Sequence, residues 1–145
     1  MTVHIVNASE IRPLRNLVLR PNLPIETTVY DLDEHHKTFH LASKVGDIIT
    51  SIGTFYPEND LDIQTTNGYR LRGIATHPKY RRNGAAAKLM RKAFQILEKK
   101  NCDTVWCNAR LVAIDFYKSL GFKEIGPEFN ISEIGSHYKM YKRLF

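Results

Sequence analysis

The residues best suited to do chemistry lie in one short stretch, Arg81-Arg82-Asn83-Gly84-Ala85-Ala86, at the start of the helical pattern within residues 81–99. The first amides of a helix have no partners inside it, and the helix dipole adds positive charge at that end. Gly84 has no side chain and lets a ligand approach the backbone closely. Arg81 and Arg82 add positive charge at the rim. This combination indicates a site for a diphosphate.

Two better-known phosphate motifs do not fit this stretch. A Walker loop ends in Gly-Lys-Ser/Thr, which the chain lacks, and a dinucleotide fingerprint needs three glycines where only Gly84 stands. The stretch fits the pattern Arg/Gln-x-x-Gly-x-Gly/Ala, with Ala86 in place of the commoner last glycine. Taken alone this match is weak, because basic residues often precede helices and a solvated helix start explains them equally well.

A second segment, WCNARLVAIDFYKSLGFKEIG, contains Asn108, Tyr117 and Gly121-Phe122 in that order. With it, the chain resembles the GNAT family of acetyl-CoA-dependent N-acetyltransferases. The resemblance rests on YRLRGIATHPKYRRNGAAAKLM and on the second segment, and with the strand order it covers roughly residues 37–143. The tail EFNISEIGSHYKM is similar to that of a small bacterial branch with a Gly-x-His-x-x-Met pattern.

The resemblance implies a set of acetyl-CoA contacts. Ile74, Ala75 and Thr76 would offer backbone groups to the pantetheine arm, and Asn108 would contact that arm from the next strand. Two parallel strands splay apart in this fold, so their unpaired backbone could bind the amide-rich arm as another strand would. The diphosphate would be held by the backbone of Arg81, Arg82, Asn83, Gly84, Ala85, Ala86 and Ala87.

The resemblance also implies direct attack of an amine on the acetyl thioester. Tyr117 matches the family's tyrosine and is the candidate acid for the departing thiolate, because a phenol is protonated at neutral pH. The alternative is a Tyr117 that only packs beneath its helix. A strand amide such as that of Ala75 would hold the oxyanion.

The general base is not evident from the sequence. His137 matches the histidine of the bacterial branch and is the best candidate for a base or an acceptor contact, although a chain of water molecules could serve instead. His35 and His36 are expected to be surface residues, and His40 to be accommodated in a strand by packing or a hydrogen bond. The spacings give no set of metal ligands, so no metal is expected.

The acceptor amine is less well defined. Alternation along one strand predicts that Arg70, Arg72, Ile74 and Thr76 share a face, and Arg12 and Arg20 could also reach the site. An arginine there would suit a carboxylate, so the hypothesis is a small-molecule amine such as an amino acid. These arginines could equally pair with acids of the N-terminal half. A protein N-terminal or lysine acetyltransferase is an alternative.

The elements that position these residues follow from periodicity. The order β-α-β-β-β-α-β-α-β-β predicts an α/β fold with a mixed sheet, and the resemblance implies a mostly antiparallel sheet with splayed parallel strands, flanked by helices. Residues 21–36 are expected to form an irregular surface connection near a site. Strands are predicted at 2–6, on both sides of a turn at 45–47 within 37–58, and at 69–76, 103–109, 123–126 and 137–145. Helices are predicted at 8–21, capped by Ser9 with Ile11, Leu14, Leu17 and Val18 on one face, at 81–99, and at 110–122, ended by Gly121.

Charge is divided unevenly along the chain. Residues 1–69 hold 5 Lys/Arg and 9 Asp/Glu, a net −4, whereas residues 70–145 hold 16 and 6, a net +10. The basic half should attract anions, which makes a nucleic-acid-binding module an alternative. No nucleic-acid partner is expected, because the chain lacks a recognisable binding motif and its aromatic residues follow apolar patterns. A non-catalytic acetyl-CoA-binding domain is a further alternative, against which Tyr117 argues.

The remaining composition is that of a soluble globular protein with one domain, residues 1–145. Cys102 and Cys107 lack the spacing of a disulfide framework or a zinc site and are expected to be buried free thiols in a reducing cytoplasm. The start resembles no secretory signal, and no apolar run reaches membrane-spanning length, so a cytoplasmic protein without a membrane partner is expected. Homodimers are common in the family, but no interface is indicated.

Overall fold

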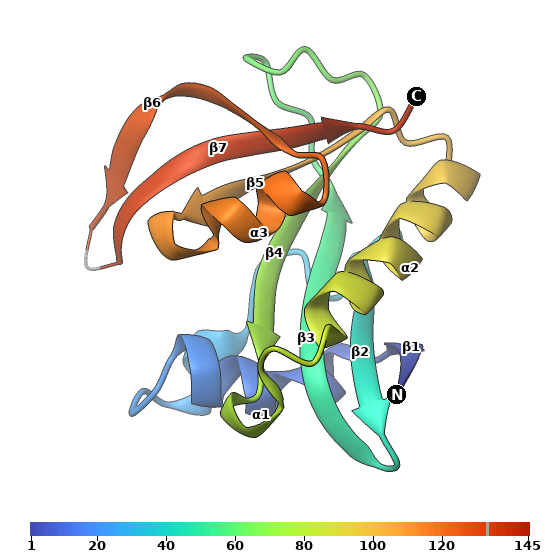
Figure 1. Ribbon diagram of the computed structural model, residues 1–145, viewed down its shortest axis with the longest axis vertical. Coiled ribbons are helices and arrows are strands. Elements are labelled where there is room, and N and C mark those ends of the chain that lie inside the picture. The colour runs from blue at the N-terminus through green and yellow to red at the C-terminus, as the bar shows by residue number, and fades with distance from the viewer. Residues whose placement is uncertain (133) are drawn as a thin grey trace. The chain divides into compact units, whose positions relative to one another are not determined.

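The computed structural model describes residues 1–132 and 134–145, and its strands and α-helices follow each other in the predicted order (Figure 1). The strands are β1 (Thr2–Val6), β2 (Phe39–Val45), β3 (Ile48–Pro57), β4 (Gly68–Thr76), β5 (Thr104–Arg110), β6 (Lys123–Ile131) and β7 (Gly135–Arg143). The α-helices are α1 (Ala8–Leu19), α2 (Ala85–Lys99) and α3 (Ile114–Ser119). Short 3-10 helices are η1 (Ile25–Thr28), η2 (Pro78–Tyr80) and η3 (Leu111–Ala113). None of the described helices is both long and apolar enough to cross a bilayer.

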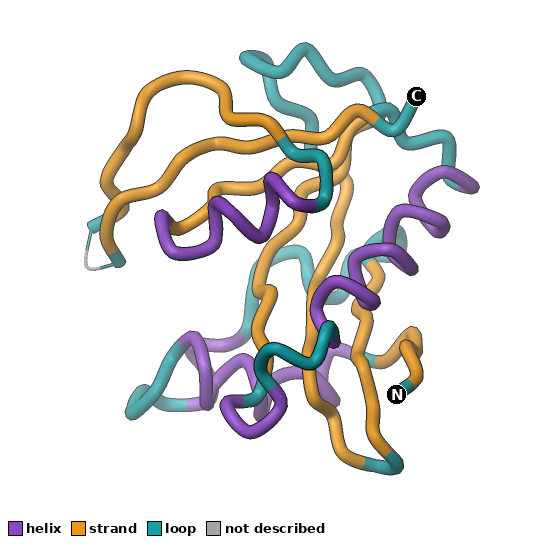
Figure 2. Tube along the Cα trace, in the orientation of Figure 1, coloured by secondary structure: helices purple, strands orange, loops and turns teal. Residues whose placement is uncertain are grey.

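The strands are hydrogen-bonded in the order β1-β2-β3-β4-β5-β7-β6 (Figure 2). The pairs β1–β2, β2–β3, β5–β7 and β6–β7 are antiparallel, whereas β4 and β5 are parallel. That parallel pairing joins only Gly68–Arg70 to Thr104–Trp106, although both strands continue well beyond it. The mixed, mostly antiparallel sheet with one parallel pair of strands is therefore confirmed.

The chain divides into two compact units. The N-terminal unit contains Met1–Tyr56 and Leu71–Leu97, and the C-terminal unit contains Pro57–Arg70 and Glu98–Phe145. That the whole chain acts as one domain stays a prediction.

In the N-terminal unit, α1 and α2 cover opposite faces of the strands. Ile52 of β3 is buried in a core cluster with Ile11 and Leu14 of α1, whereas a Cβ on the next residue, Gly53, would lie 3.2 Å from Leu89 of α2. Successive strand residues point to opposite faces, so each helix packs on its own side. Figure 1 shows α1 and α2 on these two sides.

Helix α1 differs from its prediction in two respects. Asn7, not Ser9, is the cap residue, and its amide donates to the Glu10 carboxylate at 2.7 Å. Leu17, predicted on the apolar face, is 52% exposed, whereas Arg15 is fully buried. The buried face of α1 consists of Ile11, Leu14, Arg15 and Val18. Their spacing of three and four residues fits one helix face as well as the predicted set did.

The connection between α1 and β2 is not wholly on the surface. Thr28, Tyr30 and Asp33 are buried within it. The prediction of a surface connection was wrong for these residues, because they pack around the buried guanidinium of Arg15.

In the C-terminal unit, the sheet continues from the first residues of β4 through β5, β7 and β6. Along the chain, α3 comes directly before β6. Helix α3 is shorter than predicted and is preceded by η3. It ends in a Schellman arrangement, in which the Gly121 amide donates to the Lys118 carbonyl and the Phe122 amide donates to the Tyr117 carbonyl. Gly121 has a φ of +94°, as the predicted helix end requires. Strand β6 is longer than the predicted strand at 123–126.

Candidate active site

No side chain of the cap residue covers the first backbone amides of α2. The Lys88 amide donates to the Gly84 carbonyl at 3.0 Å, so Gly84 is the cap residue of α2 and has no side chain with which to cap it. The first turn of α2 contains no acidic residue. Arg82 and Gly84 have φ values of +65° and +75°, and positive φ within such a turn brings successive amides into an anion-binding concavity.

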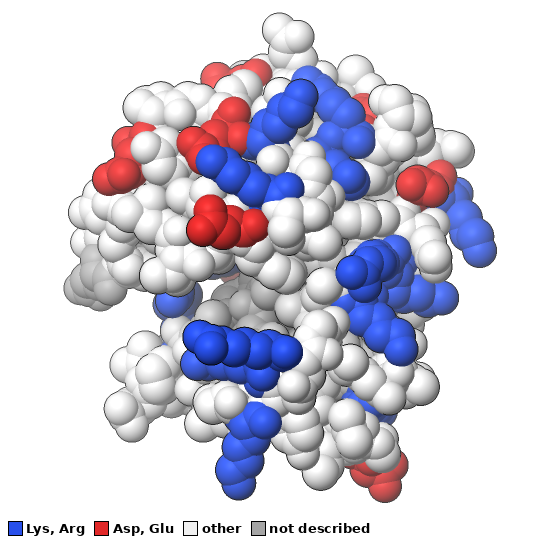
Figure 3. Space-filling model, in the orientation of Figure 1, with Lys and Arg blue, Asp and Glu red and all other residues white. Residues whose placement is uncertain are grey.

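The same turn is open to solvent. Apart from Gly84 itself, its two chain neighbours and the adjoining helix backbone, no described heavy atom lies within 4 Å of the position that a Cβ on Gly84 would take. Arg81 and Arg82 are exposed, and Arg81 Nε donates to the Thr76 carbonyl at 3.3 Å, which ties the turn to the end of β4. Figure 3 shows basic side chains gathered where Figure 1 draws α2. The exposed basic residues of α2 are Lys88, Arg91, Lys92 and Lys99.

The end of β4 is held firmly in the N-terminal unit. Ala75 is buried in the core cluster, and Ile74 and Thr76 on either side of it are half-buried. The His77 amide donates to the Thr50 carbonyl at 2.8 Å, so β4 stays fixed just before the chain turns away.

Asn108, on β5 of the C-terminal unit, lies opposite Lys139 of β7. Its Oδ1 atom is buried and has no hydrogen-bond partner among the residues that the structure describes. A buried polar atom without a partner costs free energy, on the order of 1–3 kcal/mol. The Asn108 Oδ1 atom could accept a hydrogen bond from a ligand N–H group, such as one of the amides of a pantetheine arm.

Tyr117, on α3, is buried between aromatic rings. Its ring centroid lies 5.3 Å from that of Phe116 and 5.2 Å from that of Phe122. Burial, and then the neighbouring Cys107 thiol, raise the pKa of Tyr117 well above its ordinary value. The phenol is therefore protonated at neutral pH and keeps a proton to give.

The Cys107 thiol interacts with the Tyr117 side chain from β5. Burial raises the pKa of Cys107 to about 12 and that of Cys102 to about 11, so both remain thiols. Both cysteines are free and buried, as predicted.

His137, on β7, is only 4% exposed. Its Nδ1 atom lies 2.7 Å from the Gly135 carbonyl, and its ring stacks on Phe129 with centroids 5.8 Å apart. Because a carbonyl only accepts hydrogen bonds, Nδ1 carries the proton and Nε2 of the neutral ring holds the lone pair. A histidine that acts as a general base needs such a nitrogen lone pair.

The other histidines of the connection and of β2 have local roles. His40 is buried, with Nδ1 2.8 Å from Thr54 Oγ1 and Nε2 3.0 Å from the Asp33 carbonyl, which confirms its accommodation by hydrogen bonds. The rings of His35 and His36 stack with centroids 4.5 Å apart. Among the described residues, no group of three His, Cys, Asp or Glu could hold a metal ion.

The arginines proposed for the acceptor separate into two kinds. Arg12 lies 3.4 Å from carboxylate oxygens of Asp33 and Glu34, and Arg70 lies 3.4 Å from that of Glu58, so the alternative of pairing with acids holds for both. Arg72 stacks instead on the ring of Tyr30, with Cζ 4.1 Å from its centroid.

The predicted common face of β4 is interrupted. Gly73 has a φ of +69°, which breaks regular alternation between Arg72 and Ile74. Arg20 is the C-cap residue of α1.

The sequence reasoning missed Arg15 and Tyr30. Arg15 stands three or four residues from Ile11 and Val18 on the apolar stripe of α1, and that position was the available signal. Tyr30 lies in an irregular segment, where no periodicity marks a buried ring.

Comparisons with known proteins show the family and the fold of this chain. The profile of the Acetyltransferase (GNAT) family matches residues 8–122. An uncharacterized N-acetyltransferase of Bacillus subtilis (strain 168), YitI, is 35% identical over 144 residues, which are 99% of this chain and 97% of that protein.

Two solved structures show the same fold. An aminoglycoside 6'-N-acetyltransferase complexed with coenzyme A matches with a TM-score of 0.80 at 12% identity, over 100% of this chain and 98% of its own. The ribosomal-protein-S18-alanine N-acetyltransferase of Escherichia coli matches with a TM-score of 0.74 at 18% identity, over 99% and 93% of the two chains.

Proposed function

Because the chain belongs to the GNAT family of acetyltransferases, we propose that it transfers an acetyl group to a small-molecule amine that also carries a carboxylate, such as an amino acid. The protein is an acyltransferase with acetyl-CoA as its co-substrate, which supplies the acetyl group as an activated thioester. For direct attack by the amine, the residues of the chain must orient the two reactants, hold developing negative charge and provide a proton.

The open turn before α2 is the observation that carries this proposal. The residues from Arg81 to Ala87 hold the diphosphate of the cofactor through their backbone amides. The positive φ values at Arg82 and Gly84, the absent side chain at the cap and the lack of an acid in the first helical turn all favour an anion there.

The pantetheine arm is held by the backbone of Ile74, Ala75 and Thr76 and by the side chain of Asn108. The firm anchoring of β4 supports the first contact, because backbone groups that are already fixed lose little conformational entropy on binding. The unpartnered Oδ1 of Asn108 supports the second, because an amide N–H of the arm would satisfy it.

Tyr117 donates a proton to the sulfur that leaves. The role needs a phenol that is protonated throughout the neutral range, and the raised pKa of Tyr117 meets that condition. The amide of Ala75 stabilises the oxyanion.

His137 takes the proton of the amine or contacts the acceptor. Its Nδ1 is engaged by the Gly135 carbonyl, which leaves Nε2 as the basic nitrogen. The aromatic stack with Phe129 fixes the plane of the ring.

Arg72 binds the carboxylate of the acceptor. Arg12 of α1 and Arg70 of β4 are paired with acids, whereas Arg72 of β4 is half-buried and stacked on an aromatic ring. A guanidinium of this kind suits a planar carboxylate by bidentate pairing.

Release of free thiol from acetyl-CoA tests the function directly. Amino acids, polyamines and aminoglycosides are supplied in turn, and mass spectrometry identifies the acetylated product. We expect turnover with amino acids or related carboxylates. Turnover with polyamines or aminoglycosides alone would overturn the acceptor class, and absence of turnover with every amine, in folded protein that binds coenzyme A, would overturn the catalytic role.

A further inference from the structure

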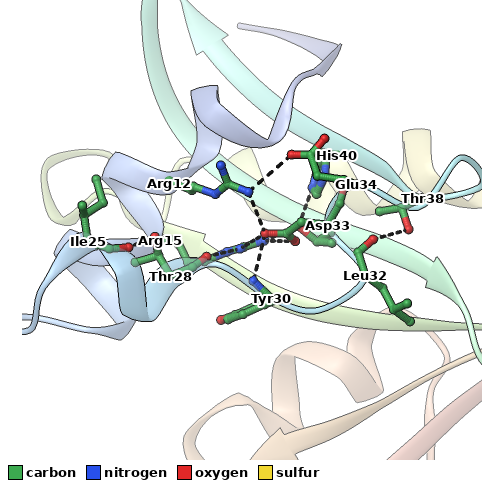
Figure 4. Close-up of polar contacts among 11 residues, drawn as sticks. Arg12, Arg15, Ile25, Thr28, Tyr30, Leu32, Asp33, Glu34, Thr38 and His40 are labelled. Carbon is green, nitrogen blue, oxygen red and sulfur yellow. Dashed lines mark hydrogen bonds and ion pairs between the residues drawn. The ribbon is translucent and has the colours of Figure 1, made fainter.

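Arg15 forms the centre of a buried polar cluster in the N-terminal unit (Figure 4). Its guanidinium is fully buried and donates to Asp33 Oδ2 at 2.8 Å, to Asp33 Oδ1 at 3.2 Å and to Thr54 Oγ1 at 2.7 Å. It also donates to the Thr28 carbonyl. These contacts neutralise its charge and leave the side chain a single position.

Tyr30 is held against this fixed guanidinium. The Tyr30 amide donates to Asp33 Oδ2 at 3.1 Å, and Arg15 Cζ lies 3.7 Å from the centroid of the Tyr30 ring. Arg72 Cζ lies 4.1 Å from the same centroid. If both guanidinium groups lay on the same face of the Tyr30 ring at these distances, they would collide. Arg15 and Arg72 therefore sandwich the ring from opposite faces.

Gly73 permits the close approach of β4 to this sandwich. A Cβ at Gly73 would lie 3.4 Å from Arg15 Nε and 3.4 Å from Tyr30 Cε2, which is tighter than most real contacts. Its φ of +69° also disfavours any other residue. The strand that carries Arg72 is therefore shaped to bring that side chain onto the ring.

Arg72 is the cation of this cluster that has no carboxylate. Arg15 pairs with Asp33, and Arg12 pairs with Asp33 and the 80% exposed Glu34. No acidic side chain among the residues that the structure describes lies within ion-pair distance of Arg72. Three guanidinium groups thus face two carboxylates, and the surplus positive charge rests on a half-buried side chain.

We infer that Tyr30 is a positioning residue for acceptor specificity, which holds Arg72 as a rigid receptor for the carboxylate of an anionic or zwitterionic amine. Stacking occupies one face of the Arg72 guanidinium and leaves its N–H groups in the plane, where a carboxylate binds edge to edge. Polycationic amines are disfavoured by the surplus charge. This inference rests on the acetyl-transfer function proposed above and narrows its substrate class.

The test compares matched acceptors that differ only in the carboxylate. The protein amino acids and their carboxamides are assayed in pairs with saturating acetyl-CoA, and the ratio of kcat/KM for acid over amide is measured. We expect a ratio of about tenfold or more, the value of a charge-assisted hydrogen-bond pair. Arg72→Gln should bring the ratio close to one and leave the KM for acetyl-CoA unchanged.

Two further variants separate Tyr30 from general effects on the fold. Tyr30→Leu should lower the ratio by about fivefold through loss of the cation–π contacts, whereas Tyr30→Phe keeps the ring and should retain the ratio. Arg70→Gln is the matched arginine control, because Arg70 lies on the same strand but pairs with Glu58, and it should also retain the ratio. Thermal unfolding identifies any variant that fails to fold. If a Tyr30 variant does not fold, the acid-over-amide ratio of Arg72→Gln decides whether the carboxylate is recognised.

A binding measurement makes the result independent of turnover. Calorimetry with coenzyme A present compares N-acetyl amino acids with their amides on wild-type and Arg72→Gln protein. A carboxylate preference that disappears in Arg72→Gln supports the inference. Equal binding of acids and amides by the wild type overturns it, even where acetyl transfer occurs, and an unchanged ratio in Tyr30→Leu overturns the role of Tyr30. Failure of acetyl transfer together with a preserved carboxylate preference would instead contradict the proposed catalytic function.

Discussion

The hydroxyl of Thr54 lies 2.8 Å from Nδ1 of the buried His40. The same hydroxyl accepts a hydrogen bond from Arg15. The Asp33 carbonyl, 3.0 Å from Nε2, can only accept, so the neutral ring carries its proton on Nε2. Nδ1 is therefore unprotonated, and Nε2–H donates to the Asp33 carbonyl. The neutral imidazole is part of the cluster, and burial lowers the pKa of His40 below 6.5.

Stability should consequently fall as the pH drops below about 6.5. The unfolded chain binds a proton at His40 near that pH, whereas the folded chain binds one only at lower pH, so the unfolded state gains protons first. Urea unfolding between about pH 7.5 and about pH 5.5 measures the loss. His40→Gln, neutral throughout, should remove this component. A variant with the same pH dependence as the wild type would exclude His40 as its source.

Asp33→Asn should destabilise the protein strongly. Burial raises the pKa of Asp33, but hydrogen bonds from Arg15 and the Tyr30 amide outweigh it and lower the pKa overall, so the carboxylate is charged. Removing it leaves the Arg15 charge buried without a partner, at a cost of about 3–5 kcal/mol. Glu34→Gln, at an exposed carboxylate, should change the free energy of unfolding by less than about 0.5 kcal/mol. Equal effects of the two substitutions in urea would contradict this account.

Gly84→Ala should weaken the use of acetyl-CoA. The added methyl group enters the open space through which the diphosphate is proposed to reach the backbone, and we expect the KM for acetyl-CoA to rise about tenfold. Gly46→Ala is the matched control, since Gly46 also has a positive φ of +59° and open space around it, but lies in the β2–β3 turn. Both variants carry similar backbone strain, so a rise in KM that is the same in both would speak against the diphosphate site.

Tyr117→Phe should lower kcat by about 10²-fold or more, because the proton for the leaving sulfur is lost. The KM for acetyl-CoA should change little, since the ring and its packing remain. Tyr141→Phe serves as control, because Tyr141 contacts Arg143 and has no proposed part in the reaction. Steady-state kinetics that show an unchanged kcat in Tyr117→Phe would remove Tyr117 from the mechanism.

Local features of the chain could be predicted from the sequence because they depend on neighbours along it. The 3.6-residue spacing of α2, the turn at Gly46 and the helix end at Gly121 all reflect conformations set within a few residues. The turn proposed to hold the diphosphate belongs to the same class, because its amides and its glycine are consecutive. The short parallel pairing of β4 and β5 followed from family resemblance rather than from any pattern of residues.

The buried polar cluster around Arg15 and the stacking of Arg72 on Tyr30 could not be predicted in this way. Arg15, Tyr30, Thr54 and Arg72 are far apart in the sequence, and the partners of each charge are known only when α1, the 20–38 connection and β2–β4 are packed together. Arg12 and Arg72 have the same side chain, yet one is neutralised by acids and the other is not. The amino-acid sequence indicated the family, the order of elements and the turn proposed for the cofactor. Folding decided which arginines pair with acids and which does not, because burial and ion pairing depend on distances in space.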